Sequence, residues 1–165
     1  MEAHPNSSPP DWPRWLHANG RRYLLFARSQ TRCEADAHDL LQEALVEAWR
    51  RGDGTRPPDD ALVFRTIRRR AVDLGRRNDR RTRRELAAPP WWTDEGALEP
   101  GLDAELARAV AALPPALREA VVLKVWGGLT FREIAAALEV PAATAASRYR
   151  YALEHLRTVL KPSRP

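Results

Sequence analysis

The chain has 165 residues, with 27 Lys and Arg against 22 Asp and Glu, giving a formal net charge of +5 at pH 7. This length holds one domain or two small ones, and the single cysteine, Cys33, excludes an internal disulfide and a cysteine-based zinc site. The opening residues lack the basic start and apolar core of a signal peptide, and no apolar run approaches the ~20 residues of a membrane helix, so we expect a cytoplasmic protein without a membrane segment.

The excess positive charge is confined to the first half of the chain. Residues 91–165 hold nine Lys and Arg against nine Asp and Glu, whereas residues 65–84 hold ten arginines against only Asp73 and Asp79. A local surplus of this size is typical of a nucleic-acid-binding surface. The alternative is a basic segment that is simply solvated.

Three helices are expected in the first half. Residues 11–32 carry an apolar face that includes Tyr23 and Phe26. In residues 34–51 the apolar positions fall on one side and most of the acidic positions on the other. Residues 52–60 are rich in Gly, Pro and Asp and predict a loop, and residues 61–84 predict a third helix that Gly75 interrupts at a cost of roughly 1 kcal/mol relative to Ala.

A linker and four helices are expected in the rest of the chain. Residues 85–101, which contain Trp91-Trp92, predict a linker because their Pro pair and Gly residues oppose a regular helix. Residues 102–113 and 116–126 predict helices separated by two prolines, and Gly127-Gly128 ends the second of them. In that second helix the inward positions are expected to be Leu117, Val121, Val125 and Trp126.

Residues 129–160 predict a short helix, a tight turn and a longer helix. Thr130 and Glu133 have the spacing of a capping box, and Pro141 stands where the second helix starts. The second helix has one apolar side, and its other side carries small, polar and basic residues. This pattern predicts a helix-turn-helix whose second helix fits the DNA major groove, although the pattern alone would also suit a helical hairpin with a solvated face.

The second half resembles the C-terminal DNA-binding region of bacterial RNA polymerase sigma factors, most closely the extracytoplasmic-function (ECF) group. The resemblance rests on the segments LPPALREAVVLKVWGGLTFREIAAALEVP and ATAASRYRYALEHLR. It implies that residues 102–161 read the upstream (−35) promoter element. The residues implied to contact this DNA are Thr144, Ser147, Arg148, Arg150 and Tyr151.

The first half carries a second resemblance, to the sigma-factor region that binds core polymerase and the downstream (−10) element. The segment DAHDLLQEALVEAWRR matches the helix that docks on the largest polymerase subunit. The resemblance implies polymerase contacts for Asp36, Asp39, Leu40, Gln42, Glu43 and Trp49. On the third helix it implies DNA contacts for Arg65, Arg68, Arg69, Arg76 and Arg77. In the 52–60 loop, which would receive a flipped-out base, it leaves open which of Asp53, Thr55, Arg56 and Asp59 makes that contact.

Several residues depart from the family pattern, among them Leu62, which replaces a usual Trp. Arg69 replaces the usual Asn, and Ala146 stands where Lys is frequent. Glu139 replaces the usual Gly of the turn, where a left-handed conformation would cost roughly 1–2 kcal/mol. The departures on the third helix leave its base preference open, and the absence of Lys at position 146 predicts a shallower salt dependence of upstream DNA binding than in a typical relative.

The sequence thus predicts an all-α protein with two small domains, residues 11–84 and 102–161, joined by the linker 85–101. The expected function is that of an alternative sigma factor that binds RNA polymerase core enzyme and promoter DNA, with an anti-sigma factor as a possible further partner. Two alternatives are a stand-alone helix-turn-helix regulator and a sigma-like adaptor that binds only protein. We find no phosphate loop, nucleophile–base pair or metal-ligand spacing, so neither an enzyme nor a cofactor is expected.

Overall fold

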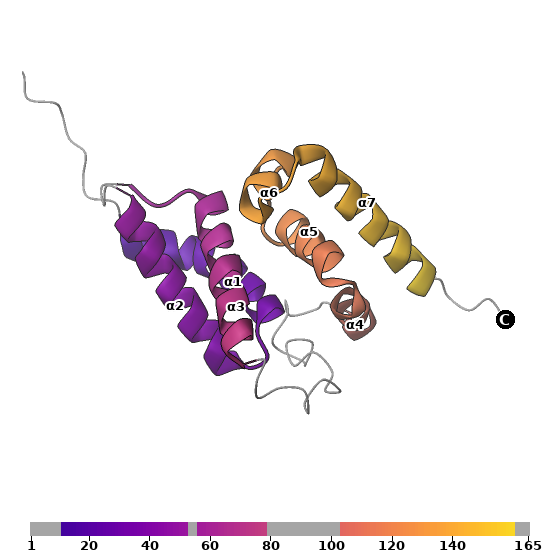
Figure 1. Ribbon diagram of the computed structural model, residues 1–165, viewed down its shortest axis with the longest axis horizontal. Coiled ribbons are helices and arrows are strands. Elements are labelled where there is room, and N and C mark those ends of the chain that lie inside the picture. Colours follow the sequence, from indigo (N-terminus) through magenta and orange to yellow (C-terminus); the bar gives the residue numbers. More distant parts are fainter. Residues whose placement is uncertain (1–10, 53–55, 79–102, 161–165) are drawn as a thin grey trace, which may run out of the picture.

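The computed structural model describes residues 11–52, 56–78 and 103–160, and within these ranges the chain forms seven helices and no strand (Figure 1). The predicted all-α class is confirmed. Several expectations lie outside the described residues: the loop positions Asp53 and Thr55, the arginines beyond residue 78, and the linker with its Trp pair.

The first half is a three-helix unit of α1 (Trp12–Gln30), α2 (Glu34–Arg51) and α3 (Asp60–Asn78). The Asp11 carboxylate caps α1 by accepting a hydrogen bond from the Arg14 amide at 3.1 Å. The core of this half is aromatic, because the Phe64 ring lies 5.0 Å from that of Tyr23 and 5.4 Å from that of Phe26. All three side chains are fully or almost fully buried, so they fix α3 against α1.

Helix α3 runs through Gly75 to Asn78, so the predicted interruption at Gly75 is wrong. A Cβ atom at this position would meet nothing within 4 Å, and the residue is exposed. The absence of a side chain therefore costs only helix propensity, about 1 kcal/mol, which is too little to end a helix whose other face is packed.

The second half contains α4 (Ala104–Ala112), α5 (Pro115–Val125), α6 (Phe131–Leu138) and α7 (Ala142–Val159). Val125 was expected to face inward but is 52% exposed. Helix α5 buries five consecutive residues, 119–123, because neighbouring helices cover more than one of its sides along its middle. A single-stripe pattern therefore describes this helix poorly.

Two glycines end α5 for different physical reasons. A Cβ at Gly127 would lie 2.5 Å from the Leu123 carbonyl oxygen, so no side chain fits there. Gly128 has a φ of 68°, in the left-handed region that glycine adopts without strain. The predicted helix end is confirmed, and the chain leaves it directly into α6.

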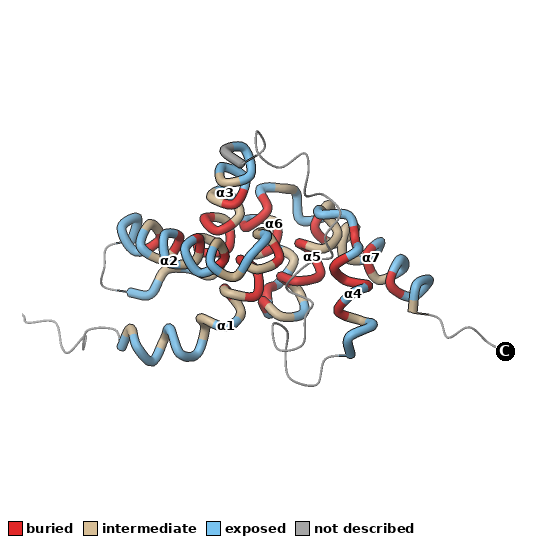
Figure 2. Tube along the Cα trace, turned by 90° about the horizontal axis from the view of Figure 1, so that it is seen from below, coloured by how far each residue is buried: buried red, intermediate tan, exposed pale blue. Residues whose placement is uncertain are grey.

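The two halves pack against each other. Helix α3 lies along α6, and α1 contacts α5 (Figure 1). Buried apolar residues from both halves belong to one cluster, while the first turns of α1 and the last turns of α7 project from it and are largely exposed (Figure 2). Arg22 of α1 also donates a hydrogen bond to the Gly127 carbonyl oxygen at 2.7 Å. We call this packed arrangement the closed form.

Candidate polymerase and nucleic-acid interfaces

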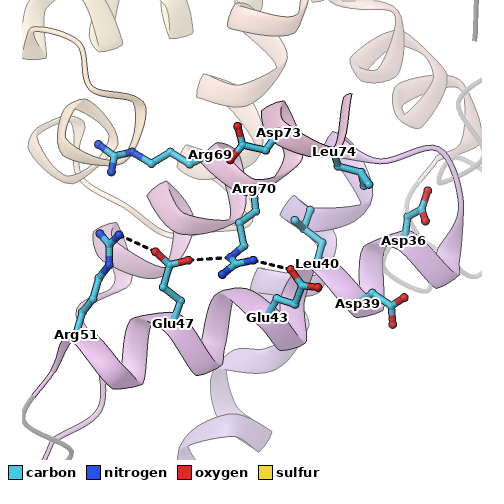
Figure 3. Close-up of a pocket in the computed structure, with 10 residues that line it drawn as sticks. All are labelled: Asp36, Asp39, Leu40, Glu43, Glu47, Arg51, Arg69, Arg70, Asp73 and Leu74. Carbon is cyan, nitrogen blue, oxygen red and sulfur yellow. Dashed lines mark hydrogen bonds and ion pairs between the residues drawn. The ribbon is translucent and has the colours of Figure 1, made fainter. Parts of the chain in front are cut away.

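An acidic groove of about 490 Å³ lies between α2 and α3 (Figure 3). Its lining residues are Asp36, Asp39, Leu40, Glu43, Glu47, Arg51, Arg69, Arg70, Asp73 and Leu74. Four carboxylates come from α2, where the i, i+3 and i+4 spacing places them along one side of the helix. This side is the one that the sequence predicts to bind polymerase.

Arg70 ties the two helices together across this groove. Its Nη1 lies 2.6 Å from a Glu43 oxygen and its Nε lies 2.7 Å from a Glu47 oxygen, so one guanidinium holds two carboxylates (Figure 3). Arg51 pairs with Glu47 as well, at 2.7 Å. Among the described residues no ion pair joins Asp36 or Asp39, and Figure 3 shows their carboxylates pointing away from Arg70. These two carboxylates are thus available to a basic partner.

The predicted polymerase-binding residues do not all lie on one surface. Asp39, Gln42 and Glu43 are exposed and Asp36 is half-buried, and all of these except Gln42 line the acidic groove. Leu40 is 4% exposed and belongs mainly to the core, although its edge lines the groove. Trp49 is 51% exposed and lies on the opposite flank of α2.

Trp49 forms part of an apolar patch between α1 and α2. Its ring lies 5.5 Å from that of Trp12, which in turn lies 5.6 Å from that of Trp15. Leu16 and Val46 also line this patch and are 44% and 39% exposed. Helix α2 therefore offers acidic groups on one flank and a tryptophan-rich surface on the other.

The α3 arginines with the predicted DNA role differ in their surroundings. Arg76 is exposed, and Arg77 lies in the last turn, where its side chain is outside the described residues. Arg68 and Arg69 pair with acidic residues of the second half, Glu119 and Glu139. Arg65 is half-buried, and its Nε has no hydrogen-bond partner among the described residues. Two of the five predicted DNA contacts of α3, Arg68 and Arg69, thus lie where the helix meets the second half, whereas Arg76 does not.

A polar cluster of Arg22, Tyr23 and Asp60 supports the start of α3. The Asp60 carboxylate accepts a hydrogen bond from the Tyr23 hydroxyl and pairs with Arg22 at 2.5 Å. Burial, together with the hydrogen bond to Asp60, raises the pKa of Tyr23 far above its ordinary value of 10.0. Burial opposes the charge of Arg22, but the hydrogen bond and charge of Asp60 outweigh it and raise the pKa of Arg22. Tyr23 and Arg22 therefore stay protonated at neutral pH.

The helix-turn-helix has the predicted caps. The Thr130 hydroxyl accepts from the Glu133 amide at 3.3 Å, and the Glu133 carboxylate accepts from the Thr130 amide at 2.7 Å. These bonds lower the pKa of Glu133, foremost the backbone bond from Thr130. Glu139 occupies the turn with a φ of 56°, so the predicted left-handed conformation is confirmed, with its strain on a non-glycine residue.

The first turns of α7 present the predicted reading surface. Ala145, Ala152 and Leu156 are buried against the domain, whereas Arg150 and Tyr151 are exposed and Thr144, Ser147 and Arg148 are partly exposed. The Arg150 guanidinium lies 5.0 Å from the Tyr151 ring centroid, a cation–π distance. The end of α7 that follows the turn therefore shows basic, hydroxyl and aromatic groups together, as major-groove contacts require.

Comparison with known proteins matches both halves. A model of sigma-70 region 2 matches residues 15–81, and one of sigma-70 region 4 matches residues 103–156. The ECF RNA polymerase sigma factor RpoE of Cereibacter sphaeroides is 31% identical over 132 residues, which are 74% of this chain and 71% of the relative. The chain belongs to the sigma-70 family. Within it, this sigma factor is of the ECF group and acts as an alternative sigma factor, directing RNA polymerase to promoters.

Two further similarities extend over most of the sigma factor. The ECF sigma factor SigE of Mycolicibacterium smegmatis is 30% identical over 161 residues, 92% of this chain and 62% of the relative. The structure of the sigma factor RpoE in complex with the anti-sigma factor NepR from Bartonella quintana aligns with a TM-score of 0.69 at 23% identity. It covers 93% of this chain and 99% of that one, so the two share a fold.

Sequence reasoning missed three residues that shape the sigma factor's surfaces. Arg22 and Glu119 join the two halves, and Arg70 locks the α2 carboxylates. Each of these residues bonds to a partner far away in the sequence, so helical periodicity does not predict the contact. Glu119 alone carried a hint, since it is a charged residue within an otherwise apolar stretch of α5.

No helix of the described part is long and apolar enough to cross a membrane.

Proposed function

We propose a division of work between the surfaces of this sigma factor. The acidic side of α2 binds core polymerase, α3 holds the downstream element, and the exposed side of α7 reads the upstream element. The observation that supports this best is the separation of charge within one small protein. Carboxylates gather on α2, while arginines gather on α3 and on the first turns of α7.

The polymerase surface consists of Asp36, Asp39, Gln42 and Glu43, with Trp49 on the opposite flank of α2. Exposed carboxylates attract a basic partner and set its orientation, and an exposed tryptophan supplies apolar area. Leu40 contributes by packing under these residues, since it is buried. In this proposal the protein is a non-enzymatic initiation subunit, and it works in the cytoplasm because its partner polymerase does.

The DNA surfaces consist of basic and hydroxyl groups from two helices. On α3 they are Arg65, Arg68, Arg69, Arg76 and Arg77. On α7 they are Thr144, Ser147, Arg148, Arg150 and Tyr151. Tethering on polymerase raises the effective concentration of each surface at the promoter, so neither needs high affinity alone. By analogy with the complex of the Bartonella relative, an anti-sigma factor is a further partner in this proposal.

The test of the polymerase surface is association with core enzyme followed by run-off transcription. The variant Asp36→Asn/Asp39→Asn/Glu43→Gln keeps size and shape while removing three charges. If each exposed carboxylate contributes about 0.5 kcal/mol, association weakens roughly 10-fold. A matched control, Glu105→Gln/Glu154→Gln, removes exposed charges elsewhere and should bind as the wild type does. Equal association of both variants would contradict the proposed surface.

A further inference from the structure

Arg70 of α3 occupies two carboxylates on the acidic flank of α2, which consists of Asp36, Asp39, Glu43 and Glu47. Its Nη1 lies 2.6 Å from a Glu43 oxygen and its Nε lies 2.7 Å from a Glu47 oxygen, and Figure 3 shows its side chain reaching across the groove to both. The Glu43 side chain is 61% exposed, so a partner in solution can reach the same carboxylate. A cation of that partner and Arg70 therefore compete for Glu43.

The two carboxylates differ in what they would keep if Arg70 left. Glu47 is 25% exposed and also pairs with Arg51 at 2.7 Å, so it would retain a cation. Glu43 makes no other ion pair within the described part of the chain. Loss of Arg70 thus frees Glu43 and leaves no buried carboxylate without a partner.

The packing of α2 against α3 does not depend on Arg70. The two helices lie along each other, and Ala44 and Ala48 of α2 belong to the same buried cluster as Ile67 and Ala71 of α3. The Arg70 side chain is 36% exposed, and ion pairs with this much contact to water contribute little to folding stability. The main effect of Arg70 therefore falls on the charge of the surface.

Arg70 makes the whole groove less acidic. Five carboxylates and three guanidinium groups line the groove, which gives it a formal net charge of −2, and without Arg70 the net charge would be −3. Surface charge of this kind acts on the rate at which a basic partner associates and on the orientation in which it docks.

We infer that Arg70 is an internal competitor of core polymerase on the acidic flank, and that docking replaces Arg70 at Glu43 with a cation of polymerase. The inference rests on the proposed assignment of this flank to polymerase. Asp36 and Asp39 are free of ion pairs within the described residues, so they make the first contacts, and Glu43 joins the interface once Arg70 has left it. A basic partner that meets only the two aspartates binds less tightly, so Arg70 favours the partner whose cations also fit Glu43.

Arg70→Gln should therefore strengthen the association of the full chain with core polymerase, although it removes a contact between two helices. Breaking an exposed ion pair lowers affinity by a factor of about 1.5 to 5, which the wild type loses on docking and the variant does not. We expect the affinity of the variant to be higher by this factor at about 50 mM salt. The difference should shrink toward zero at about 0.5 M salt, where exposed charges are screened.

A double-mutant cycle tests whether Arg70 acts through Glu43. The affinity of the full chain for core polymerase is measured by fluorescence anisotropy for wild type, Arg70→Gln, Glu43→Gln and the double variant. Arg51→Gln, alone and with Glu43→Gln, removes an equal charge from the same groove without a bond to Glu43. In the Glu43→Gln background the effect of Arg70→Gln should fall to that of Arg51→Gln. The distant control Arg108→Gln should bind as the wild type does.

Urea unfolding checks that each variant folds. If Arg70→Gln does not fold, Arg70→Lys keeps the cation but cannot hold two carboxylates with one planar group, so it should give a smaller gain in affinity. An affinity of both Arg70 variants at or below that of the wild type would overturn the competition. So would a gain from Arg70→Gln that is equally large with and without Glu43. The polymerase assignment itself fails in a different way, because Asp36→Asn/Asp39→Asn/Glu43→Gln would then bind core polymerase as tightly as the wild type.

Discussion

Two arginines on the exposed side of α7 should set much of the salt dependence of promoter binding. Arg150 is exposed and Arg148 partly exposed, both on the helix that follows the turn. Replacing both with Gln removes two cations without removing the hydrogen-bonding capacity of the side chains. Each lost phosphate contact lowers the slope of log K against log salt by about 0.9, so the double variant should lose about 1.8 from the slope.

This change in slope gives a large difference in affinity. Between 50 and 200 mM salt the wild-type holoenzyme should lose about 12-fold more affinity than the double variant does, from two contacts at about 0.9 each. The number of arginines on the upstream surface also limits how steep its salt dependence can be. Its exposed or partly exposed arginines are Arg132, Arg148, Arg150 and Arg157, so the slope attributable to it should not exceed roughly 4 in magnitude.

The assay is fluorescence anisotropy of holoenzyme on a duplex promoter identified by run-off transcription, repeated across a salt series. The matched control is Arg108→Gln, which removes an exposed arginine of α4 whose guanidinium donates to its own helix. Its slope should equal that of the wild type. A double variant with an unchanged slope, or a control that changes as much, would refute the assignment of α7 to DNA.

Three further outcomes follow from local geometry. Glu139→Gly should be more stable than Glu139→Ala by about 1 kcal/mol in urea unfolding, because only glycine adopts the φ of 56° without strain; equal stability would contradict this. The pKa of Tyr23 is raised in the folded state. The folding stability that its protonated hydroxyl contributes is therefore present below pH 10, the ordinary pKa of tyrosine, and decreases as the pH rises above that value. The stability gap between wild type and Tyr23→Phe should therefore narrow between pH 9 and 11, and a constant gap would contradict this. Thr130→Ala should cost about 1 kcal/mol through the lost cap, whereas Thr158→Ala, on an exposed turn of α7, should cost less.

Local signals in the sequence predicted the elements well, for identifiable reasons. The capping box at Thr130, the left-handed turn at Glu139 and the proline start of α7 are each set by residues within a few positions. The errors arose where tertiary packing decides. The unfavourable helix propensity of Gly75 alone does not end a helix with a packed face. Helix α5 does not follow the single periodicity that would turn Val125 inward.

The acidic and basic surfaces could also be located from sequence, since charge spacing along one helix fixes which side carries it. The sequence could not show which charged residues form ion pairs with residues of other helices. Arg70 is one of ten arginines in its segment, and nothing local distinguishes its role across α2 from a DNA role. Leu40 shows the same limit, because its position in the predicted polymerase-binding segment does not reveal that its side chain is buried.

Two positions where the chain departs from the family pattern meet in space. Arg69 stands where Asn is usual on the downstream helix, and Glu139 stands where Gly is usual in the turn. The structure pairs them across the two halves, and the hydrogen bond from Arg69 lowers the pKa of Glu139. Glu139 thus combines a left-handed backbone conformation with an ion pair to Arg69 that glycine, which has no side chain, could not make.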